Sequence, residues 1–283
     1  MTRDFRLPNL IIGGAQKSGT TSLHNELASH SKIFMSTPKE LEFFHDDTNF
    51  ERGLNWYSQF FRNADGKTIL GESCPEYLYF KKVPGRIVRC LPGIKLIFIL
   101  RNPVDRAYSG YWHSVRYGIE GLSFEKALLE ESRRIARGYY EQYHFSYIDR
   151  GFYIIQLKRY LEHFESSQIL VLKSEDYFAN APMTMQKIMD FLGIETETRH
   201  IQNAGKIKYN TGRVPRSIRL QTIYPFLNEH FRMAARVINR INLKKQQFPP
   251  MPDLIRAQLI EQYRESNKEL ENLFRLDLSS WNS

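Results

Sequence analysis

The residues most able to do chemistry lie in a glycine-rich segment near the N-terminus, GGAQKSGTTS over residues 13–22. An apolar run over residues 7–13 predicts a buried parallel strand before it, and the spacing of Leu23 and Leu27 predicts a helix over residues 21–29 after it. In such a turn successive backbone N–H groups point inward, and the helix N-terminus favours negative charge. The segment therefore predicts a loop that holds a phosphate.

This loop departs from the pattern of nucleotide triphosphatases, G-x-x-x-x-G-K-[ST]. Gly14 and Gly19 occupy the two glycine positions, but Thr20 stands where the lysine belongs, and the lysine lies inside the loop at Lys17. No predicted strand ends in an aspartate that would hold magnesium. The pattern favours phosphate binding over hydrolysis of a triphosphate, with a purely structural glycine turn as the alternative.

A second candidate segment is FILRNPVDRAYSGY, residues 98–111. Arg101 ends the strongest predicted strand, residues 95–100, and Pro103 stands in the first turn of a predicted helix, where proline fits best. Arg101 offers a bidentate guanidinium fork to a phosphate, and Ser109 adds a hydroxyl two helical turns along. Because parallel strands end at one edge of a sheet, where such folds bind nucleotides, the two segments predict a single nucleotide site.

Positive charge is concentrated in one part of the chain. The 283 residues contain 40 Lys and Arg against 31 Asp and Glu, a formal net charge of +9. Residues 199–245 hold eleven basic residues and one acid, Glu229, so the rest of the chain is nearly neutral. Glycines, a proline and the lack of a helical period predict a loop over residues 206–219, which is a candidate anion clamp. For residues 232–245 a solvated basic helix face is the simpler interpretation.

The composition, 42% hydrophobic and 25% charged, is that of a globular protein and argues against disorder, collagen and coiled coil. No apolar run reaches the length of about 18 residues that a membrane span needs, and the first residues lack the pattern of a signal peptide. Cys74 and Cys90 cannot form a disulfide framework, which favours a reducing compartment. No Cys/His spacing indicates a metal site.

Predicted strands alternate with predicted helices, which is typical of an α/β fold with a mostly parallel sheet between helical layers. Further strands are expected at residues 67–71 and 168–172, and helices at 124–137, 153–164, 183–192, 218–241 and 254–274. The last two make the C-terminal part α-rich. We expect a single domain over residues 1–283, with a basic loop over residues 199–216 and helices over about 217–275 packed onto it.

The displaced lysine points to a family. The segment IIGGAQKSGTTSL resembles the 5′-phosphosulfate loop of sulfotransferases that use 3′-phosphoadenosine 5′-phosphosulfate (PAPS), and residues 98–111 are similar to their 3′-phosphate motif. The resemblance implies a P-loop-type three-layer fold and PAPS as co-substrate, with no metal. It places Arg101 and Ser109 at the 3′-phosphate. At the 5′ side it places Lys17, Ser18, Gly19, Thr20 and Thr21.

The likeness is closest to the Golgi heparan-sulfate sulfotransferase branch and its soluble bacterial relatives. It rests on KELEFF at residues 39–44, Gly53 with Trp56 and Tyr57, Glu72 with Pro75 and Tyr77, and Val83-Pro84 before a helix. Thr211-Gly212-Arg213 lies where the family has a Lys-Gly-Arg loop over the nucleotide, so Gly212, Arg213 and Arg216 are expected to bind it. Ser73 stands where several heparan-type enzymes have a second lysine. The resemblance covers roughly residues 7–216.

Sulfuryl transfer is an in-line displacement in which positioning and charge stabilisation do most of the work, by analogy with phosphoryl transfer. Lys17 can follow the negative charge to the bridging oxygen as the bond breaks. The family's catalytic glutamate falls at Glu40, which we expect to be the base. Glu42 is the near alternative, on the same side of an extended chain, and Glu40 pairing only with Lys39 or Lys17 is the structural one. His45 and His113 are rival bases without a supporting motif.

These observations predict a PAPS-dependent sulfotransferase. Its acceptor would be a hydroxyl of a small molecule or saccharide, with an amine or guanidine as alternatives. We expect a cytoplasmic, bacterial protein of secondary metabolism with neither nucleic acid nor membrane as partner. The oligomeric state is left open. Two other functions compete: a P-loop nucleotide kinase, and a non-catalytic polyanion binder that uses residues 199–245.

Overall fold

The computed structural model describes residues 5–197, 213–246 and 248–282. The chain groups into two compact units, the first built from residues 1–101, 153–209 and 273–276, the second from residues 102–152, 210–272 and 277–283. The single domain expected from the sequence stays a prediction.

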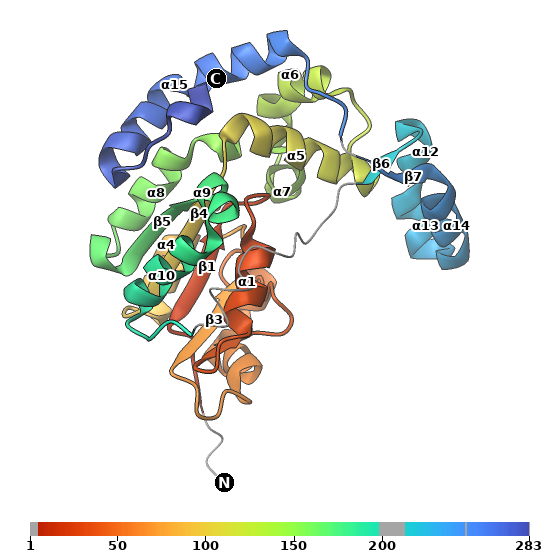
Figure 1. Ribbon diagram of the computed structural model, residues 1–283. Helices are drawn as coiled ribbons and strands as arrows, with labels where there is room; N and C mark the ends of the chain where they lie inside the picture. Colours follow the sequence, from red (N-terminus) through yellow and green to blue (C-terminus); the bar gives the residue numbers. More distant parts are fainter. Residues whose placement is uncertain (1–4, 198–212, 247, 283) are drawn as a thin grey trace. The chain divides into compact units, whose positions relative to one another are not determined.

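A five-stranded parallel sheet forms the centre of the first unit (Figure 1). Its order is β2-β3-β1-β4-β5, so β1 lies in the middle and β2 at one edge. The strands are β1 (Leu10–Gly14), β2 (Ile33–Met35), β3 (Ile69–Ser73), β4 (Lys95–Leu100) and β5 (Ile169–Lys173). Every residue of β1 is buried, which explains why this strand is continuously apolar rather than alternating.

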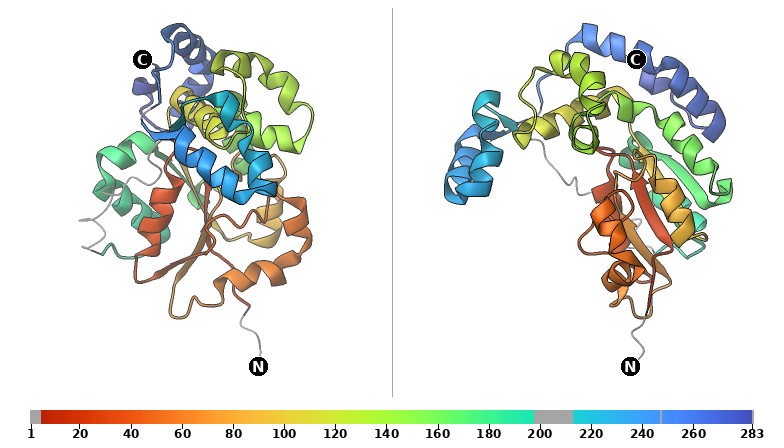
Figure 2. Two further views of the ribbon diagram at one scale, coloured as in Figure 1. Left: turned by 90° about the vertical axis from the view of Figure 1, so that its right-hand side faces the viewer. Right: turned by 180° about the vertical axis from the view of Figure 1, so that it is seen from behind.

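Helices cover both faces of this sheet (Figure 1 and Figure 2). On one face Leu10 and Ile12 of β1 pack in a core with side chains of α1 (Thr20–Ala28) and α10 (Ala181–Leu192). On the other, the ring of Phe98 in β4 contacts that of Tyr160 in α8 (Tyr153–Leu161), with centroids 4.7 Å apart. The predicted three-layer α/β fold is confirmed. The remaining helices are α2 (Asp47–Glu51), α3 (Gly53–Tyr57), α4 (Val83–Cys90), α9 (Ser174–Ala179) and the short 3-10 helices η1 (Ser58–Phe61) and η3 (Ser166–Gln168).

The second unit is mainly helical, as the sequence predicts for the C-terminal part. Its core joins Tyr111 and Trp112 of α5 to Tyr263 of α15, with further apolar residues from α6. The elements are α5 (Pro103–Arg116), α6 (Phe124–Ile135), α7 (Tyr139–Phe145), η2 (Asp149–Gly151), β6 (Arg213–Pro215), α12 (Ile218–Gln221), α13 (Tyr224–His230), α14 (Arg232–Asn242), β7 (Leu243–Lys245), α15 (Asp253–Phe274) and η4 (Ser279–Asn282).

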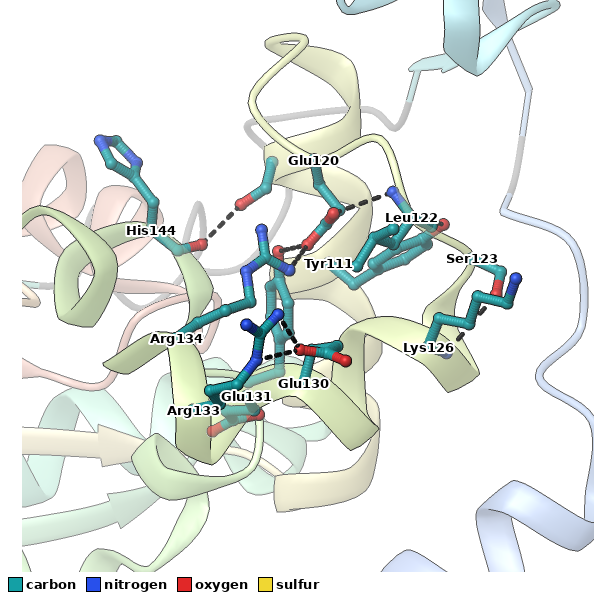
Figure 3. A network of polar contacts seen from close by, with 12 residues as sticks. Tyr111, Glu120, Leu122, Ser123, Lys126, Glu130, Glu131, Arg133, Arg134 and His144 are labelled. Atoms are coloured by element: carbon teal, nitrogen blue, oxygen red, sulfur yellow. Dashed lines mark hydrogen bonds and ion pairs between the residues drawn. The ribbon is translucent and has the colours of Figure 1, made fainter. Parts of the chain in front are cut away.

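Two buried carboxylates tie α6 to neighbouring segments of this unit (Figure 3). Glu120 accepts hydrogen bonds from the guanidinium of Arg134 at 2.6 Å and from the hydroxyl of Tyr147 at 2.9 Å. Glu131 accepts the backbone N–H groups of Ile148 and Asp149 at 2.7 and 2.8 Å. Burial raises the pKa of Glu131 to about 7, against the lowering effect of these two hydrogen bonds.

The basic C-terminal stretch differs from its prediction in two ways. Residues 218–241 form three short helices, α12, α13 and α14, instead of one. Residues 213–219, the described part of the predicted loop, instead form β6 and the first turn of α12, because β6 pairs antiparallel with β7 over Arg213–Lys245 to Pro215–Leu243.

Buried amides hold these helices to the end of α5. Gln221 donates to the carbonyl oxygen of Arg116 at 2.8 Å and to the side chain of Asn239 at 2.9 Å. Asn242 donates to the side chain of Gln221 at 2.9 Å. Gly118 has a φ of +74°, and a Cβ there would lie 2.2 Å from the carbonyl oxygen of Gln221. Only glycine permits this close approach. Within the described residues, no helix is both long and apolar enough to cross a membrane.

Candidate active site

The predicted phosphate loop leaves the middle of the sheet, where β1 ends at Gly14 and α1 begins at Thr20. The backbone approaches its neighbours closely at this point. A Cβ on Gly13 would lie 2.5 Å from the ring of Phe98, and one on Gly14 would lie 2.7 Å from the Cβ of Leu78. The two glycines of the motif therefore have a packing reason, because any side chain would push the strand end off its neighbours.

The loop turns sharply through residues with left-handed backbone conformation. Lys17 has a φ of +68° and Gly19 a φ of +104°, and Ser18 lies between them. Ser18 is fully buried, and its hydroxyl has no hydrogen-bond partner in the part of the chain that the structure describes. Burying a hydroxyl without a hydrogen-bond partner costs free energy. The arrangement therefore fits a site where the oxygen of a bound phosphate or sulfonate accepts the hydrogen bond of Ser18.

Arg101 lies against this loop. Its guanidinium donates to the carbonyl oxygen of Lys17, with Nη1 and O 3.4 Å apart. Its own carbonyl oxygen accepts a hydrogen bond from the hydroxyl of Tyr153 at 2.9 Å. The carboxyl ends of β1 and β4 therefore place Arg101 beside the loop that carries Lys17 and Ser18. That these residues bind a nucleotide stays a prediction.

Glu40 is connected to the same edge of the sheet by an ion pair with Lys39. The Nζ of Lys39 lies 2.6 Å from Oε1 of Glu40 and 3.4 Å from the hydroxyl oxygen of Thr20, the first residue of α1. The carbonyl oxygen of Lys39 accepts the backbone N–H of Ser73, the last residue of β3, at 3.3 Å. One ammonium group thus connects the candidate base with the start of the loop's helix, and 37% of the Glu40 side chain stays exposed.

Lys39 is the residue that sequence reasoning undervalued, since it entered only as a partner for Glu40. The signal that would have found it is β2, a strand of three residues that was not predicted. Once β2 is placed beside β3, residues just after it must lie at the carboxyl edge with the phosphate loop.

The segment after Glu40 is not extended, contrary to the sequence-based expectation. Glu42 has a φ of +55°, which turns the chain. Leu41 is 3% exposed, so it points into the protein, and Phe43 and Phe44 are also buried. In an extended strand the side chains of Glu40 and Glu42 would point to the same side. Because the chain turns at Glu42, this alternation does not apply here.

Tyrosine side chains hold this turn in place. The hydroxyl oxygen of Tyr77 accepts the backbone N–H groups of Phe43 and Phe44 at 3.0 and 3.3 Å. The ring of Tyr57 stacks on that of Phe43, with centroids 4.4 Å apart, and its hydroxyl donates to Glu72 at 2.5 Å. Tyr57 and Tyr77 thus fix Phe43 and Phe44, the residues that follow the turn after Glu40.

We expect Tyr77→Phe to lower the free energy of unfolding by about 1–3 kcal/mol, because two buried N–H groups lose their only shared acceptor. Tyr160→Phe is the matched control. It removes one hydroxyl that donates to the carbonyl oxygen of Tyr77 at 2.7 Å, so we expect a loss of about 1 kcal/mol. Urea unfolding of both variants measures the difference. A larger loss in Tyr160→Phe than in Tyr77→Phe would contradict this account.

Glu72 is a titrating group inside the fold. It is completely buried, and burial raises its pKa from 4.5 to about 7, against the lowering effect of the hydrogen bond from Tyr57. The folded protein therefore keeps a proton that the unfolded chain releases near pH 4.5. Stability must fall as the pH rises from 4.5 to about 7 and level off above that.

We expect Glu72→Gln to reduce the loss of unfolding free energy between about pH 5 and pH 8 by about 3 kcal/mol, because glutamine does not titrate. Denaturant unfolding across this range measures it. Glu131→Gln, in the other unit, is a matched variant because the pKa of Glu131 is raised to the same value. An unchanged pH dependence in Glu72→Gln would show that Glu72 is ionised in the folded protein.

The histidines considered as rival bases have different surroundings. His45 is completely buried, with its ring stacked on Phe80 at 5.4 Å. His113 belongs to α5 in the second unit, where its ring contacts Tyr117. A further histidine, His24, lies one turn into α1, and burial together with the charge of Lys39 lowers its pKa to about 4. His24 is therefore neutral at physiological pH.

The remaining predicted residues divide between the two units. Thr21 is half-buried in the first turn of α1, and Ser73 is buried at the end of β3 with no partner for its hydroxyl among the described residues. Ser109, Arg213 and Arg216 belong to the second unit, Ser109 buried on α5 and both arginines exposed. Gly212 and the neighbouring Thr211 lie outside the described residues.

Solved structures of known proteins share this fold. A sulfotransferase from Alicyclobacillus acidocaldarius matches with a TM-score of 0.73 and 26% identity, covering 98% of this chain and 100% of that one. A retinol dehydratase solved with androsterone and the inactive cofactor PAP matches with a TM-score of 0.52 and 14% identity, covering 93% of this chain and 82% of that one. At 14% identity the second match shows a shared fold only.

Proteins with similar sequences point to the same family as these structures. The human bifunctional heparan sulfate N-deacetylase/N-sulfotransferase 2 is 31% identical over 201 residues, which cover 67% of this chain but 22% of that protein. This chain therefore spans about a fifth of the length of such relatives. The model of a family described as the sulfotransferase domain matches residues 7–213. The resemblance seen in the two phosphate motifs is confirmed, and the chain belongs to the sulfotransferase family.

Proposed function

We propose that this protein transfers a sulfuryl group from PAPS to a hydroxyl or amine of a small molecule or saccharide. The observation that carries the proposal is the Lys39 ammonium, which lies 2.6 Å from Glu40 and 3.4 Å from Thr20 of the phosphate loop. It brings a carboxylate able to accept a proton next to a loop built for an anion. Family membership supports sulfuryl as the transferred group.

The loop residues Lys17, Ser18, Gly19, Thr20 and Thr21 would hold the 5′ end of the co-substrate. The buried, unpartnered hydroxyl of Ser18 and the left-handed turn at Lys17 fit an anionic group there. Arg101 and Ser109 would hold the 3′-phosphate. Gly212, Arg213 and Arg216 would contribute to a segment over the nucleotide. The PAP in the retinol dehydratase of the same fold supports this choice of nucleotide.

In the reaction, Glu40 accepts the proton of the acceptor hydroxyl or amine as the bond from the acceptor to sulfur forms. The bond from sulfur to the nucleotide's phosphate oxygen breaks, and Lys17 stabilises the charge that develops on that oxygen. Lys39 holds the Glu40 carboxylate in position through their ion pair. Positioning by these three side chains reduces the entropy cost of bringing acceptor and donor into line.

The first test is binding of adenosine 3′,5′-bisphosphate, measured by calorimetry, with adenosine 5′-monophosphate as the control that lacks the 3′-phosphate. We expect binding of the bisphosphate and much weaker binding of the monophosphate. Failure of the bisphosphate to bind would overturn the proposal. Magnesium-dependent turnover of ATP would instead support a nucleotide kinase.

The second test identifies the acceptor. Transfer of ³⁵S-labelled sulfate from PAPS is measured with sugars, amino sugars, small alcohols and small amines. The likeness to heparan sulfate N-sulfotransferases favours an amino sugar, whose N-acetylated form is the matched control because it lacks the nucleophilic amine. Equal labelling of both forms would assign transfer to a hydroxyl.

A further inference from the structure

The helices α13 and α14 of the second unit carry an exposed apolar surface that the proposed function does not use. Contact between the two helices places their apolar side chains on one module. Their large side chains are exposed to a degree unusual for their type: Phe226 57%, Phe231 57%, Met233 73%, Val237 53% and Ile241 63%. Single exposed hydrophobic residues are normal, but these five lie within residues 226–241 on two helices in contact, and such a group is typical of an interaction site.

Most large apolar side chains of this module are exposed rather than buried. Where α14 packs on the rest of the unit, Asn242 donates to the side chain of Gln221 in α12 and to the carbonyl oxygen of Ser217, and the small residue Ala235 is buried. The exposed apolar side chains of α14 lie on the other side, in water. An ordinary surface helix buries its apolar stripe and exposes its polar one.

Positive charge flanks the apolar stripe. On α14, Met233, Val237 and Ile241 follow each other at intervals of four residues and form one stripe along the helix. Arg232, Arg236 and Arg240 repeat at the same interval, one residue earlier, so they form a parallel stripe about 100° around the helix. None of these arginines forms an ion pair with an acidic side chain in the described ranges. Residues 213–246 contain eight basic residues and one acid.

We propose that the α13–α14 surface, formed by these five apolar residues and three arginines, docks on the face of a bilayer that contains anionic lipids. An amphipathic helix that lies in the membrane interface needs an apolar face that enters the acyl boundary and basic residues beside it that contact acidic headgroups. The surface has both. It requires no long apolar segment, so it is compatible with a chain whose described helices cannot span a membrane.

Charge decides against other occupants. A second copy of the chain would bring the same unpaired arginines face to face, which costs free energy. A nucleic acid would pair with the arginines but leave the phenylalanines and the Met233 stripe in water. The expectation of no membrane partner rested on the lack of a spanning segment. That argument does not apply to a helix lying on the surface.

Flotation with lipid vesicles tests the proposal on the full chain. We expect the protein to float with vesicles made of equal parts phosphatidylcholine and phosphatidylglycerol, and not with phosphatidylcholine alone. Replacing Arg232, Arg236 and Arg240 with alanine should weaken binding about a hundredfold, at about fivefold per charge. Replacing Met233, Val237 and Ile241 with serine should weaken it on the order of a hundredfold.

Matched variants separate this surface from general effects. Lys126, Lys187 and Lys268 are exposed, and their triple alanine variant loses the same charge elsewhere, so it should bind like the wild type. Leu129, Leu254 and Met183 are equally exposed apolar residues, and their triple serine variant serves the same purpose. Thermal unfolding of each variant checks that the fold is intact. A Val237→Cys variant in a Cys90→Ser background, labelled with a polarity-sensitive fluorophore, should report an apolar environment only with anionic vesicles.

Three results would overturn the proposal. The wild type could fail to float with anionic vesicles. The serine variant could float as well as the wild type, which would reduce the effect to plain electrostatic adsorption. Alternatively, sedimentation without lipid could show association of the wild type that the serine variant lacks, which would assign the surface to a protein partner or a second copy. Sulfuryl transfer to a dissolved acceptor should be unchanged in all these variants, so the outcome is independent of the proposed function.

Discussion

Replacing Lys17 with alanine should lower the rate of sulfuryl transfer by about two to three orders of magnitude, the effect of removing one preorganised group that stabilises charge in a transition state. The loop turns at Lys17, which has a φ of +68° and is followed by Ser18 with its buried hydroxyl. The Lys17 side chain is therefore attached at the turn of the loop. The same change should weaken binding of adenosine 3′,5′-bisphosphate, because the loop loses its positive charge.

The backbone conformation at Lys17 needs its own control. Alanine is as strained as lysine at a positive φ, so Lys17→Ala changes the charge but not the strain. Lys17→Arg retains the charge and should keep part of the activity, and Lys17→Met retains the length without the charge and should behave like alanine. Single-turnover transfer of ³⁵S measures all three. If Lys17→Met transferred as fast as the wild type, charge at this position would have no role in the reaction.

Replacing Glu40 with glutamine should lower transfer by about two to four orders of magnitude, the usual contribution of a positioned general base. Binding of adenosine 3′,5′-bisphosphate should remain nearly unchanged, since the role proposed for Glu40 is toward the acceptor and not the nucleotide. Glutamine keeps the shape of the side chain and can still accept a hydrogen bond from Lys39, so the change isolates the proton acceptor. The measurement pairs the transfer rate with calorimetry on the same preparation.

Two neighbouring variants make this result specific. Glu42→Gln removes a carboxylate two residues away, at the turn of the chain, and it should transfer at a rate near that of the wild type. Lys39→Met removes the ion pair and leaves the carboxylate without its positioning partner, so we expect a smaller loss than in Glu40→Gln. An active Glu40→Gln with an inactive Glu42→Gln would move the base to Glu42.

Local patterns predicted the parts of this fold that depend on local physics. The strand at residues 95–100 was located at its true limits, because an uninterrupted apolar run is what a doubly covered parallel strand requires. Pro103 likewise marked the start of α5, where its fixed φ and missing N–H suit the first turn. The glycine-rich loop was recognised for the same reason, since strand, turn and helix follow one another directly in the chain.

The parts that were missed depend on contacts distant in sequence. Ile33–Met35 is too short to show a period, and it becomes a strand only because β3 pairs with it. The contact of Lys39 with Thr20 follows from that pairing and could not be read from spacing. Pro225 stands in the first turn of α13 and signals the break within residues 218–241, which were predicted as one helix. The Arg213–Pro215 strand depends on a partner nearly thirty residues later.

The order of the sheet gives the two halves of the site different resistance to local opening. The predicted phosphate loop directly follows β1, which has a hydrogen-bonded strand on each side. Lys39 and Glu40 instead follow β2, a three-residue strand at the edge of the sheet. Amide hydrogens of β1 should therefore exchange with solvent only when the whole unit unfolds, and those of β2 should exchange much sooner through local fluctuations. Under the proposed function, the half of the site that would meet the acceptor can thus relax around molecules of different shape, while the half that would hold the nucleotide stays rigid.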